Sequence, residues 1–299
     1  MSAVQPTSSP PAIVHVSAKG PFSLEHTLQS GQTFRWRAKD EWHYGVVGRS
    51  VWKVRQARQG MDFSSYPEAP ETIRHYVRRY FRLDDDLNQI YARLGKDERV
   101  VGAIKQYRGL RLVRQDPWEC LVTFMISSFS NIRRIAKHIE DMSRLYGDEV
   151  AMDGVTLYTF PTAGRLGELG EEDFRTLGLG YRARYLARLA EFFASGGADL
   201  MYLRGAPYQE AKDALLRIYG VGEKVADCVL LFSLDKLEAC PVDVWVRRVL
   251  TEWYFPGQKV TDRVLREWAA SWFGQDAGYA QQYLFHQRRL AGKAKPLSA

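Results

Sequence analysis

Hydrophobic and polar positions alternate along the first third of the chain. From Ile13 to Phe63 they form short runs of period two, which predict strands with one buried face. Turn residues separate the runs at 39–40, 48–50 and 59–60, so the strands should form an antiparallel meander. We expect strands at 33–37, 42–47 and 51–54, preceded by a short helix over Ser23–Leu28.

Beyond about residue 98 the apolar residues recur at helical spacing. Residues 118–129 are apolar nearly all round, which predicts a central buried helix. Further helices are expected at 132–145, 171–177, 185–193 and 263–290, and two earlier ones between 70 and 94, separated by an acidic run at 83–86. The glycine-rich stretch 147–170 is expected to be a loop.

The predicted fold class is therefore α+β, with an N-terminal antiparallel sheet lobe followed by a helical body. We place the sheet lobe, with its helices, at 13–110 and the helical body at 111–290. A disordered lead over 1–12 and a loose tail over 291–299 complete the expected organisation.

Composition narrows the class of partner. The 299 residues carry a formal net charge of +7, with a pI near 9.2, which suits a polyanion such as nucleic acid. No run of eighteen apolar residues occurs, so no membrane span is expected. The start MSAVQPTSSPPA lacks the basic and apolar regions of a signal peptide, which favours a cytoplasmic protein. Cys120, Cys228 and Cys240 show no Cys-x-x-Cys spacing and are expected to be reduced, buried thiols.

The candidate chemistry lies between residues 207 and 250. Two helical stretches are joined by Gly220-Val221-Gly222, a turn in which the backbone reverses tightly and the following amides can meet an anion. Lys224 follows within one turn, and Asp243 begins a third helix. On spacing alone, Lys224 is equally a nucleophile or a surface lysine that contacts phosphate. Asp243 is a helix cap, a catalytic carboxylate, or both.

The segments GVGEKVADC (220–228) and PVDV (241–244) resemble the helix-hairpin-helix, Gly-Pro-Asp signature of DNA glycosylases, and most closely the 8-oxoguanine DNA glycosylase family. Four further blocks fit that family in the same order: SGQTFRW (30–36), RLVRQDPWECL (111–121), LGLGYRARY (177–185) and YAQQYLF (279–285). The resemblance extends from about residue 13 to about 290. It implies a glycosylase body of the helix-hairpin-helix type and a bifunctional DNA glycosylase/AP lyase of base excision repair.

The resemblance also implies which residues react. Lys224 would displace an oxidised purine, most often 8-oxoguanine, and form a Schiff base with C1′, which permits strand cleavage by β-elimination. An amine attacks only when it is unprotonated, and burial near the positive end of a helix favours that form. Asp243 would stabilise positive charge on the sugar. No cysteine follows Cys240, so the iron–sulfur cluster of some relatives is excluded on ligand count. No cofactor or metal is expected, apart from a monovalent cation at the hairpin.

A base inside a duplex must be flipped out to react, and the family resemblance assigns its pocket. The carbonyl of Gly31 would accept a hydrogen bond from N7–H, which 8-oxoguanine has and guanine lacks. Gln281 would read the Watson–Crick edge, and Phe285 and Cys228 would sandwich the ring. From the residues alone, Phe285 and Cys228 fit a hydrophobic core as well, and Gly31 fits an ordinary turn.

The resemblance further assigns the contacts to duplex DNA, which the protein is expected to bind as a monomer. Gly220 and Gly222 would present amides to a phosphate, a contact that positions the strand without reading its sequence. Among the residues that would hold the duplex open, Tyr181 is the wedge, Arg182 and Arg134 read the orphaned cytosine, and Asn131 fills part of the gap. The alternative to base reading for each arginine is a contact with phosphate or a solvent-exposed charge.

Two positions depart from the family pattern. Phe129 stands where an asparagine commonly enters the duplex, and Trp245 stands where a histidine often follows the catalytic aspartate. Opposite-base preference and lesion range are therefore open. Two rival functions are an alkylated-base glycosylase of the same fold, which needs no lysine, and a non-catalytic helix-hairpin-helix module, which needs neither Lys224 nor Asp243. The departures and the missing targeting segment favour a prokaryotic cytoplasm, with the protein associated with the nucleoid. In a eukaryote the expected location is the nucleus.

Overall fold

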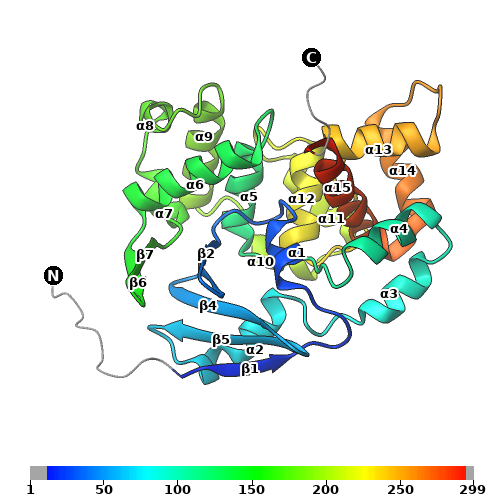
Figure 1. Ribbon diagram of the computed structural model, residues 1–299. Coiled ribbons are helices and arrows are strands. Elements are labelled where there is room, and N and C mark those ends of the chain that lie inside the picture. Colours follow the sequence, from blue (N-terminus) through cyan, green and yellow to red (C-terminus); the bar gives the residue numbers. More distant parts are fainter. Residues whose placement is uncertain (1–11, 294–299) are drawn as a thin grey trace, which may run out of the picture.

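The computed structural model describes residues 12–293, and an antiparallel sheet lies at its base, below a helical body (Figure 1). The sheet has the order β1-β5-β4-β3-β2. Its strands are β1 (Val14–Ser17), β2 (Arg37–Lys39), β3 (Trp42–Val47), β4 (Ser50–Ala57) and β5 (Gly60–Tyr66). Val54 pairs with His43 on one side and Phe63 on the other. The inward faces of these strands pack on α1 (Leu24–Gln29) and α2 (Pro70–Tyr80), which confirms the predicted meander and its leading helix.

The strand expected at 33–37 is wrong, because only Arg37 of that stretch enters a strand, β2. Three consecutive side chains in this stretch all contact residues of the helices. In a strand, consecutive side chains would point to opposite faces of the sheet. Phe34 packs edge-on against Phe124, and the next residue, Arg35, pairs with Glu119 at 2.9 Å. Trp36 Nε1 then donates to the Tyr80 hydroxyl at 3.2 Å. These inward contacts are incompatible with the alternation of a strand.

Helices make up the rest of the described chain, apart from one hairpin. They are α3 (Leu87–Leu94), α4 (Glu98–Gln106), α5 (Pro117–Ile126), α6 (Ile132–Tyr146), α7 (Ala163–Gly167), α8 (Glu171–Thr176), α9 (Arg182–Ala194), α10 (Leu200–Gly205), α11 (Tyr208–Leu216), α12 (Glu223–Ser233), α13 (Val244–Tyr254), α14 (Asp262–Phe273), the 3₁₀ turn η1 (Gly274–Asp276) and α15 (Ala277–Lys293). The buried helices α5 and α12 form the centre, where Phe124 stacks on Phe232 with centroids 5.3 Å apart. The predicted central helix is confirmed, although it ends at Ile126.

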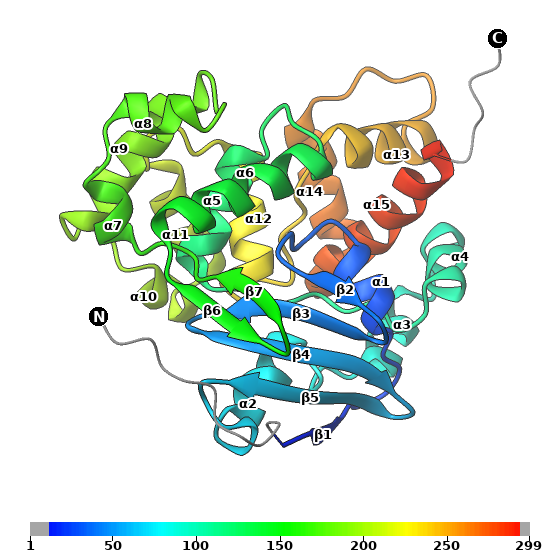
Figure 2. The same cartoon turned by 60° about the vertical axis from the view of Figure 1, so that its left-hand side comes forward.

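The loop expected over 147–170 contains a hairpin instead, formed by β6 (Glu149–Met152) and β7 (Val155–Tyr158). It lies against the β3 and β4 side of the sheet (Figure 2). Met152 and Leu157 pack on Trp42 and Tyr44 there. Its turn, Asp153-Gly154, has positive φ angles of 53° and 70°, as a two-residue hairpin turn requires. The Asp-Gly pair was the available sequence signal.

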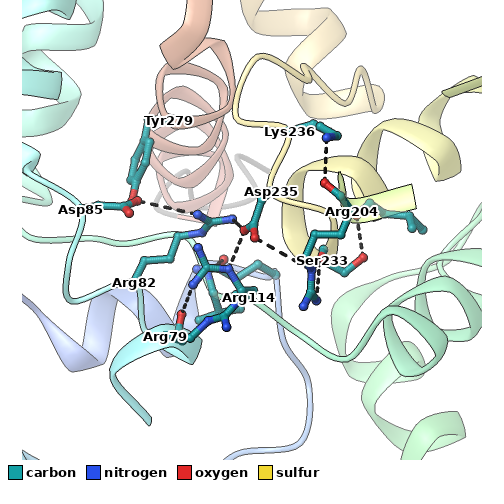
Figure 3. Close-up of polar contacts among 12 residues, drawn as sticks. Arg79, Arg82, Asp85, Arg114, Arg204, Ser233, Asp235, Lys236 and Tyr279 are labelled. Carbon is teal, nitrogen blue, oxygen red and sulfur yellow. Dashed lines mark hydrogen bonds and ion pairs between the residues drawn. The ribbon is translucent and has the colours of Figure 1, made fainter. Parts of the chain in front are cut away.

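An ion cluster joins the sheet lobe to the helical body directly after α12 (Figure 3). Asp235 Oδ1 accepts hydrogen bonds from Arg82 and Arg114, both at 2.5 Å. Arg204 Nε of α10 lies 3.9 Å from the other carboxylate oxygen. Because these arginines come from separate parts of the chain, the cluster sets the position of α12 relative to the sheet.

The structure describes three residues of the expected tail and only one residue of the expected lead. Helix α15 continues to Lys293, so residues 291–293 of the expected tail are helical. The expected lead, apart from residue 12, and residues 294–299 lie outside the described residues.

Candidate active site

Lys224 is the second residue of α12, and its side chain is directed at the end of α5. Its half-buried Nζ donates to Ser127 Oγ at 2.7 Å and lies 5.0 Å from the centre of the Phe124 ring. The amine is therefore held between two central helices, unlike a lysine that is free to follow a surface phosphate. The positive end of α12 lies beside it.

Asp243 caps the start of α13, since its Oδ1 accepts a hydrogen bond from the Val246 amide at 2.8 Å. Burial raises the pKa of Asp243, and the helix amides and the charge of Lys224 oppose that rise without cancelling it. Within residues 12–293 no ion pair closer than 4.0 Å involves Asp243. The role as a helix cap is thus confirmed, and the catalytic role stays a prediction, since the carboxylate has no ion-pair partner within that range.

Cys228 lies one turn beyond Lys224 on α12 and interacts with it. Burial raises the pKa of the Cys228 thiol to about 12. The thiol is therefore neutral, and this wall of the site is weakly polar rather than nucleophilic. All three cysteines are buried and free, as expected.

Gly31 and Phe285, which are distant in the sequence, are neighbours in the structure. Gly31 has a φ of +79°, and an added Cβ would lie 3.3 Å from Phe285 Cε1 and 3.0 Å from Ile132 Cδ1. Both the backbone conformation and the close approach therefore require glycine. The adjoining Gln32 is clamped: its Nε2 donates to the Arg111 carbonyl at 2.7 Å, and its Oε1 accepts from the Val113 amide at 2.8 Å. The backbone around Gly31 is thus held rigidly.

Gln281 precedes Phe285 by one helical turn on α15, so both lie on one face. Gln281 is buried, and its Oε1 has no hydrogen-bond partner within the described residues. A buried acceptor without a partner is costly unless a ligand supplies one. The structure therefore brings Gly31 close to Phe285 and leaves a buried acceptor on the same face of α15, and the purine pocket at these residues stays a prediction.

The hairpin glycines differ in what they permit. Gly220 has a φ of +84°, and an added Cβ would lie 2.7 Å from Tyr185 Cδ1, so only glycine fits. Gly222 has an ordinary φ of −95° and open space around it, and it begins α12 with no side-chain cap. The fold itself does not require glycine at 222. The first amides of α12 are left facing an open surface that a phosphate can approach closely.

Ion pairs to the buried Asp227 and the exposed Glu223 fix the hairpin from behind. Lys212 Nζ of α11 lies 2.9 Å from Glu223 and 3.0 Å from Asp227, both on α12. Arg266 of α14 lies 3.8 Å from Asp227. These contacts hold the helices on either side of the Gly-x-Gly turn in one orientation.

Of the residues predicted to hold the duplex open, Tyr181 and Arg134 are exposed, as those roles require. Asn131 caps α6 by accepting from the Arg134 amide at 3.0 Å. Arg134 Nε donates to His138 at 3.4 Å, and burial lowers the pKa of His138, so the ring is a neutral acceptor.

Arg182 differs from Tyr181 and Arg134 in its exposure, and its role as a reader stays a prediction. It is buried, and its guanidinium donates to the carbonyls of Ser128 and Phe129. These carbonyls face inward because Phe129 adopts a left-handed conformation with a φ of 50°. The two departing positions also differ in exposure: Phe129 is almost fully exposed, whereas Trp245 is half-buried beside Arg248, whose guanidinium lies 5.6 Å from its ring.

Sequence reasoning missed three residues of the site: Ser127, Phe124 and Ile132. The polar pair Ser127-Ser128 after an apolar helix was the only signal for the partner of Lys224. Nothing in the sequence indicates that Ile132 meets Gly31, because that contact depends on how α6 packs.

Other types of site have less support in the structure. No group of three or more His, Cys, Asp or Glu side chains in residues 12–293 could hold a metal ion. No helix in that range is long and apolar enough to cross a membrane. Two cavities, of about 430 and 520 Å³, share no residue with the site; one lies beside Trp268 and the other beside Tyr219.

Comparisons with known proteins agree with this geometry. The family profile described as "8-oxoguanine DNA glycosylase, N-terminal domain" matches residues 14–121, and "HhH-GPD superfamily base excision DNA repair protein" matches 122–275. A probable N-glycosylase/DNA lyase of Methanothermobacter thermautotrophicus is 33% identical, covering 91% of this chain and 95% of the relative. N-glycosylase/DNA lyase OGG1 of Arabidopsis thaliana is 34% identical, covering 95% and 86%. The Clostridium acetobutylicum 8-oxoguanine glycosylase/lyase, crystallised with DNA containing cytosine opposite 8-oxoG, superposes with a TM-score of 0.86 at 31% identity, covering 91% of this chain and 93% of that one.

Proposed function

The chain belongs to the 8-oxoguanine DNA glycosylase family of the HhH-GPD superfamily and is a DNA N-glycosylase/lyase, and we propose that Lys224 and Asp243 carry its reaction on oxidised purine in duplex DNA. The observation that supports this most directly is the placement of Lys224 Nζ. It is bonded to Ser127 at 2.7 Å inside the molecule, and its charge acts on the buried Asp243.

The proposed reaction forms one bond to Lys224 as it breaks one to the base. The Nζ lone pair attacks C1′, and the C1′–N bond electrons leave with the purine, which takes up a proton. The attached nitrogen loses a proton, and the sugar ring opens as O4′ accepts one, which gives the Schiff base. Removal of a C2′ proton then expels the 3′ phosphate by β-elimination. Asp243, when ionised, stabilises the positive charge that develops on the sugar.

The pocket residues support a purine with a hydrogen on N7. The Gly31 carbonyl, held in place by its rigid surroundings, accepts a hydrogen bond from N7–H of 8-oxoguanine. In guanine, N7 is itself an acceptor and would face the carbonyl without a hydrogen between them. Such a mismatch costs about 1–3 kcal/mol. The unpartnered Gln281 Oε1 meets the base edge, and Phe285 and Cys228 take the two faces of the ring.

Duplex DNA is the partner that the surface supports. The open amides at Gly222 meet a phosphate, and the backbone from Gly220 to Gly222 would hold a monovalent cation, which would add positive charge beside the strand. Tyr181 and Arg134 contact the duplex at the vacated position. We further propose that the protein acts as a monomer in a prokaryotic cytoplasm; sedimentation velocity tests the first point and fluorescence localisation in the source organism the second.

Borohydride trapping tests the proposed chemistry. The protein is mixed with a duplex that carries 8-oxoguanine, reduced with borohydride, and analysed for a covalent protein–DNA adduct. We expect an adduct from the natural sequence and none from Lys224→Gln. Lys105→Gln, which changes an exposed lysine of α4, is the matched control and should trap normally.

The same assay separates the rival functions. A natural protein that releases a base but never forms an adduct is an alkylated-base glycosylase, which uses water as its nucleophile. A protein that binds the duplex and does neither is a DNA-binding module. Either result rejects the role of Lys224.

A further inference from the structure

The end of α1 is bound by side chains of α15, the last helix of the described chain. Gln282 Nε2 donates a hydrogen bond to the Ser30 carbonyl at 3.0 Å, and Arg289 Nη2 donates one to the Gln29 carbonyl. The last carbonyls of an α-helix have no partner within their own helix, so donors from another helix can fix the path of the chain that follows. The residue that follows is Gly31, whose carbonyl is the proposed acceptor for N7–H of the lesion.

The same face of α15 carries two other residues that are proposed to bind the base. Positions 281, 282, 285 and 289 recur at helical spacing, so Gln281 and Phe285 lie beside the two donors. The centre of the Arg289 guanidinium lies 5.9 Å from the centre of the Phe285 ring. The proposed edge reader, the proposed stacking ring and the backbone that leads to Gly31 are therefore all held by one helix.

Arg289 is buried at a cost in free energy. Only 8% of it is exposed, its Nε has no hydrogen-bond partner among the described residues, and within residues 12–293 it forms no ion pair with a carboxylate. Burial lowers the pKa of Arg289, because the guanidinium loses its water. A neutral donor could cap the end of a helix without this cost. Buried charges that are poorly compensated are kept mainly where they serve function.

We propose that Gln282 and Arg289 are positioning residues for lesion recognition, and that they hold the Gly31 carbonyl at a fixed distance from a base stacked on Phe285. This inference rests on the proposed function, since it requires a flipped purine. The lesion differs from guanine at N7 by one hydrogen atom, and a hydrogen bond to that atom is lost when its acceptor moves by more than about 0.5 Å. A carbonyl that is free to move would therefore accept guanine and 8-oxoguanine almost equally.

Equilibrium binding to two duplexes, which differ only in having 8-oxoguanine or guanine at one position, tests the proposal. Every protein carries Lys224→Gln, so that no base is excised. With the natural residues at 282 and 289, we expect 8-oxoguanine to be bound roughly tenfold more tightly than guanine. Gln282→Met keeps the length of the side chain but removes its donor, and it should reduce that preference by about fivefold. Binding to the guanine duplex should not change, because a base that stays stacked does not use the pocket.

The role of Arg289 is tested with the same two duplexes. Arg289→Ala should reduce the preference as Gln282→Met does, and Arg289→Lys should restore most of it, because lysine can still donate to the Gln29 carbonyl. Gln287→Met is the matched control. It makes the same change on the same helix, at a side chain whose Nε2 donates to Gln106 Oε1 at 3.3 Å, and should leave both affinities unchanged. If the two affinities fall together in the test variants, or if neither falls, these residues support the fold alone and the proposal is wrong.

Hydrogen–deuterium exchange of the peptide that spans residues 29–36 separates positioning from direct contact with the base. Gln282→Met and Arg289→Ala should both speed its exchange, because the end of α1 is then held less firmly. A loss of preference without faster exchange would mean that these side chains contact the base themselves, which rejects the positioning role.

Two further results keep the tests decisive. Thermal denaturation shows whether Arg289→Ala folds; if it does not, Gln282→Met and Arg289→Lys carry the test, and a normal preference in Gln282→Met rejects the proposal. The protein that carries Lys224→Gln alone shows whether the proposed function fails first. If it has no preference for 8-oxoguanine, the proposed purine pocket is rejected and this inference with it. A preference that survives in all the variants rejects only this inference.

Discussion

Asp235 and Asp243 lie in the same connection between α12 and α13, yet their surroundings are opposite. Asp235 is surrounded by guanidinium groups from three segments (Figure 3). Burial alone would raise the pKa of Asp235, but Arg82 and Arg114 outweigh it and hold the pKa below its usual value. Asp243 has amide donors and one lysine that is not ion-paired with it, and burial raises its pKa.

The difference separates a carboxylate that supports the fold from one that we propose supports a reaction. Asp235 is ionised at a gain in stability, because its partners outweigh the loss of water. Asp243 is ionised at a cost, since an incompletely compensated charge is buried. Such a cost is retained where the charge meets a developing positive charge in the transition state.

The largest expected effect comes from Asp243→Asn. Removal of the charge should lower the single-turnover excision rate by about 10²–10³-fold. The free energy of unfolding should not fall, because asparagine also caps helices and carries no buried charge. Urea unfolding and quenched-flow excision measure the two quantities. A variant that keeps a tenth of the natural rate would show that the carboxylate is only a cap.

Asp235→Asn should produce the converse result. Loss of the charge leaves Arg82 and Arg114 with a neutral amide in place of their carboxylate, so we expect the free energy of unfolding to fall by about 2 kcal/mol, less than for a fully buried pair. Excision per folded molecule should be unchanged. The control is Asp84→Asn, which breaks the exposed pair with Arg78 and should cost less than about 0.5 kcal/mol. Equal losses in both variants would remove the structural role of Asp235.

The two hairpin glycines can be compared in the same way: we expect Gly220 to support the fold and Gly222 to support DNA binding. Gly220→Ala should lower the free energy of unfolding by about 1–2 kcal/mol, because the positive φ and the Tyr185 ring both oppose a Cβ. Gly222→Ala should fold normally and bind duplex DNA several-fold more weakly, because its Cβ would stand between the α12 amides and a phosphate. Thermal melts and salt titrations of binding measure these effects. Normal DNA binding by Gly222→Ala contradicts the phosphate contact.

The pH dependence of stability should differ in sign between the two aspartates, because the pKa of Asp235 is lowered and that of Asp243 is raised. The lowered pKa of Asp235 contributes stability above its usual value near 3.8 that is lost as pH falls through the folded-state pKa. The natural protein should therefore exceed Asp235→Asn at pH 7, and the gap should close below about pH 4.

For Asp243 the folded-state pKa is raised, so its contribution is full below 3.8 and is lost as pH rises through the folded-state value. Asp243→Asn should accordingly gain relative to the natural protein toward neutral pH. Urea unfolding from about pH 2 to 7.5 follows both differences. Parallel curves for the two variants would show that the aspartates are equivalent.

The hydrophobic periodicity of the sequence predicted most helices and strands correctly. It failed where side chains contact residues far away in the chain. Periodicity predicted the sheet lobe and the helices, including the buried α5, because burial on one face imposes a period. It failed at 33–37, where Arg35 and Trp36 turn toward helices far along the chain. It also missed the β6–β7 hairpin, whose short strands depend on packing against β3 and β4.

By itself, the sequence determined the Gly-x-Gly turn, the lysine that follows it and the aspartate that begins α13, because these lie within one local unit whose spacing sets their geometry. Only the tertiary structure decided that Arg182 is buried beneath Phe129, that Gly31 meets Phe285, and that two nearby aspartates have opposite pKa shifts. The physical reason is that solvent exclusion and charge partners come from segments far apart in the chain, and no local pattern records them.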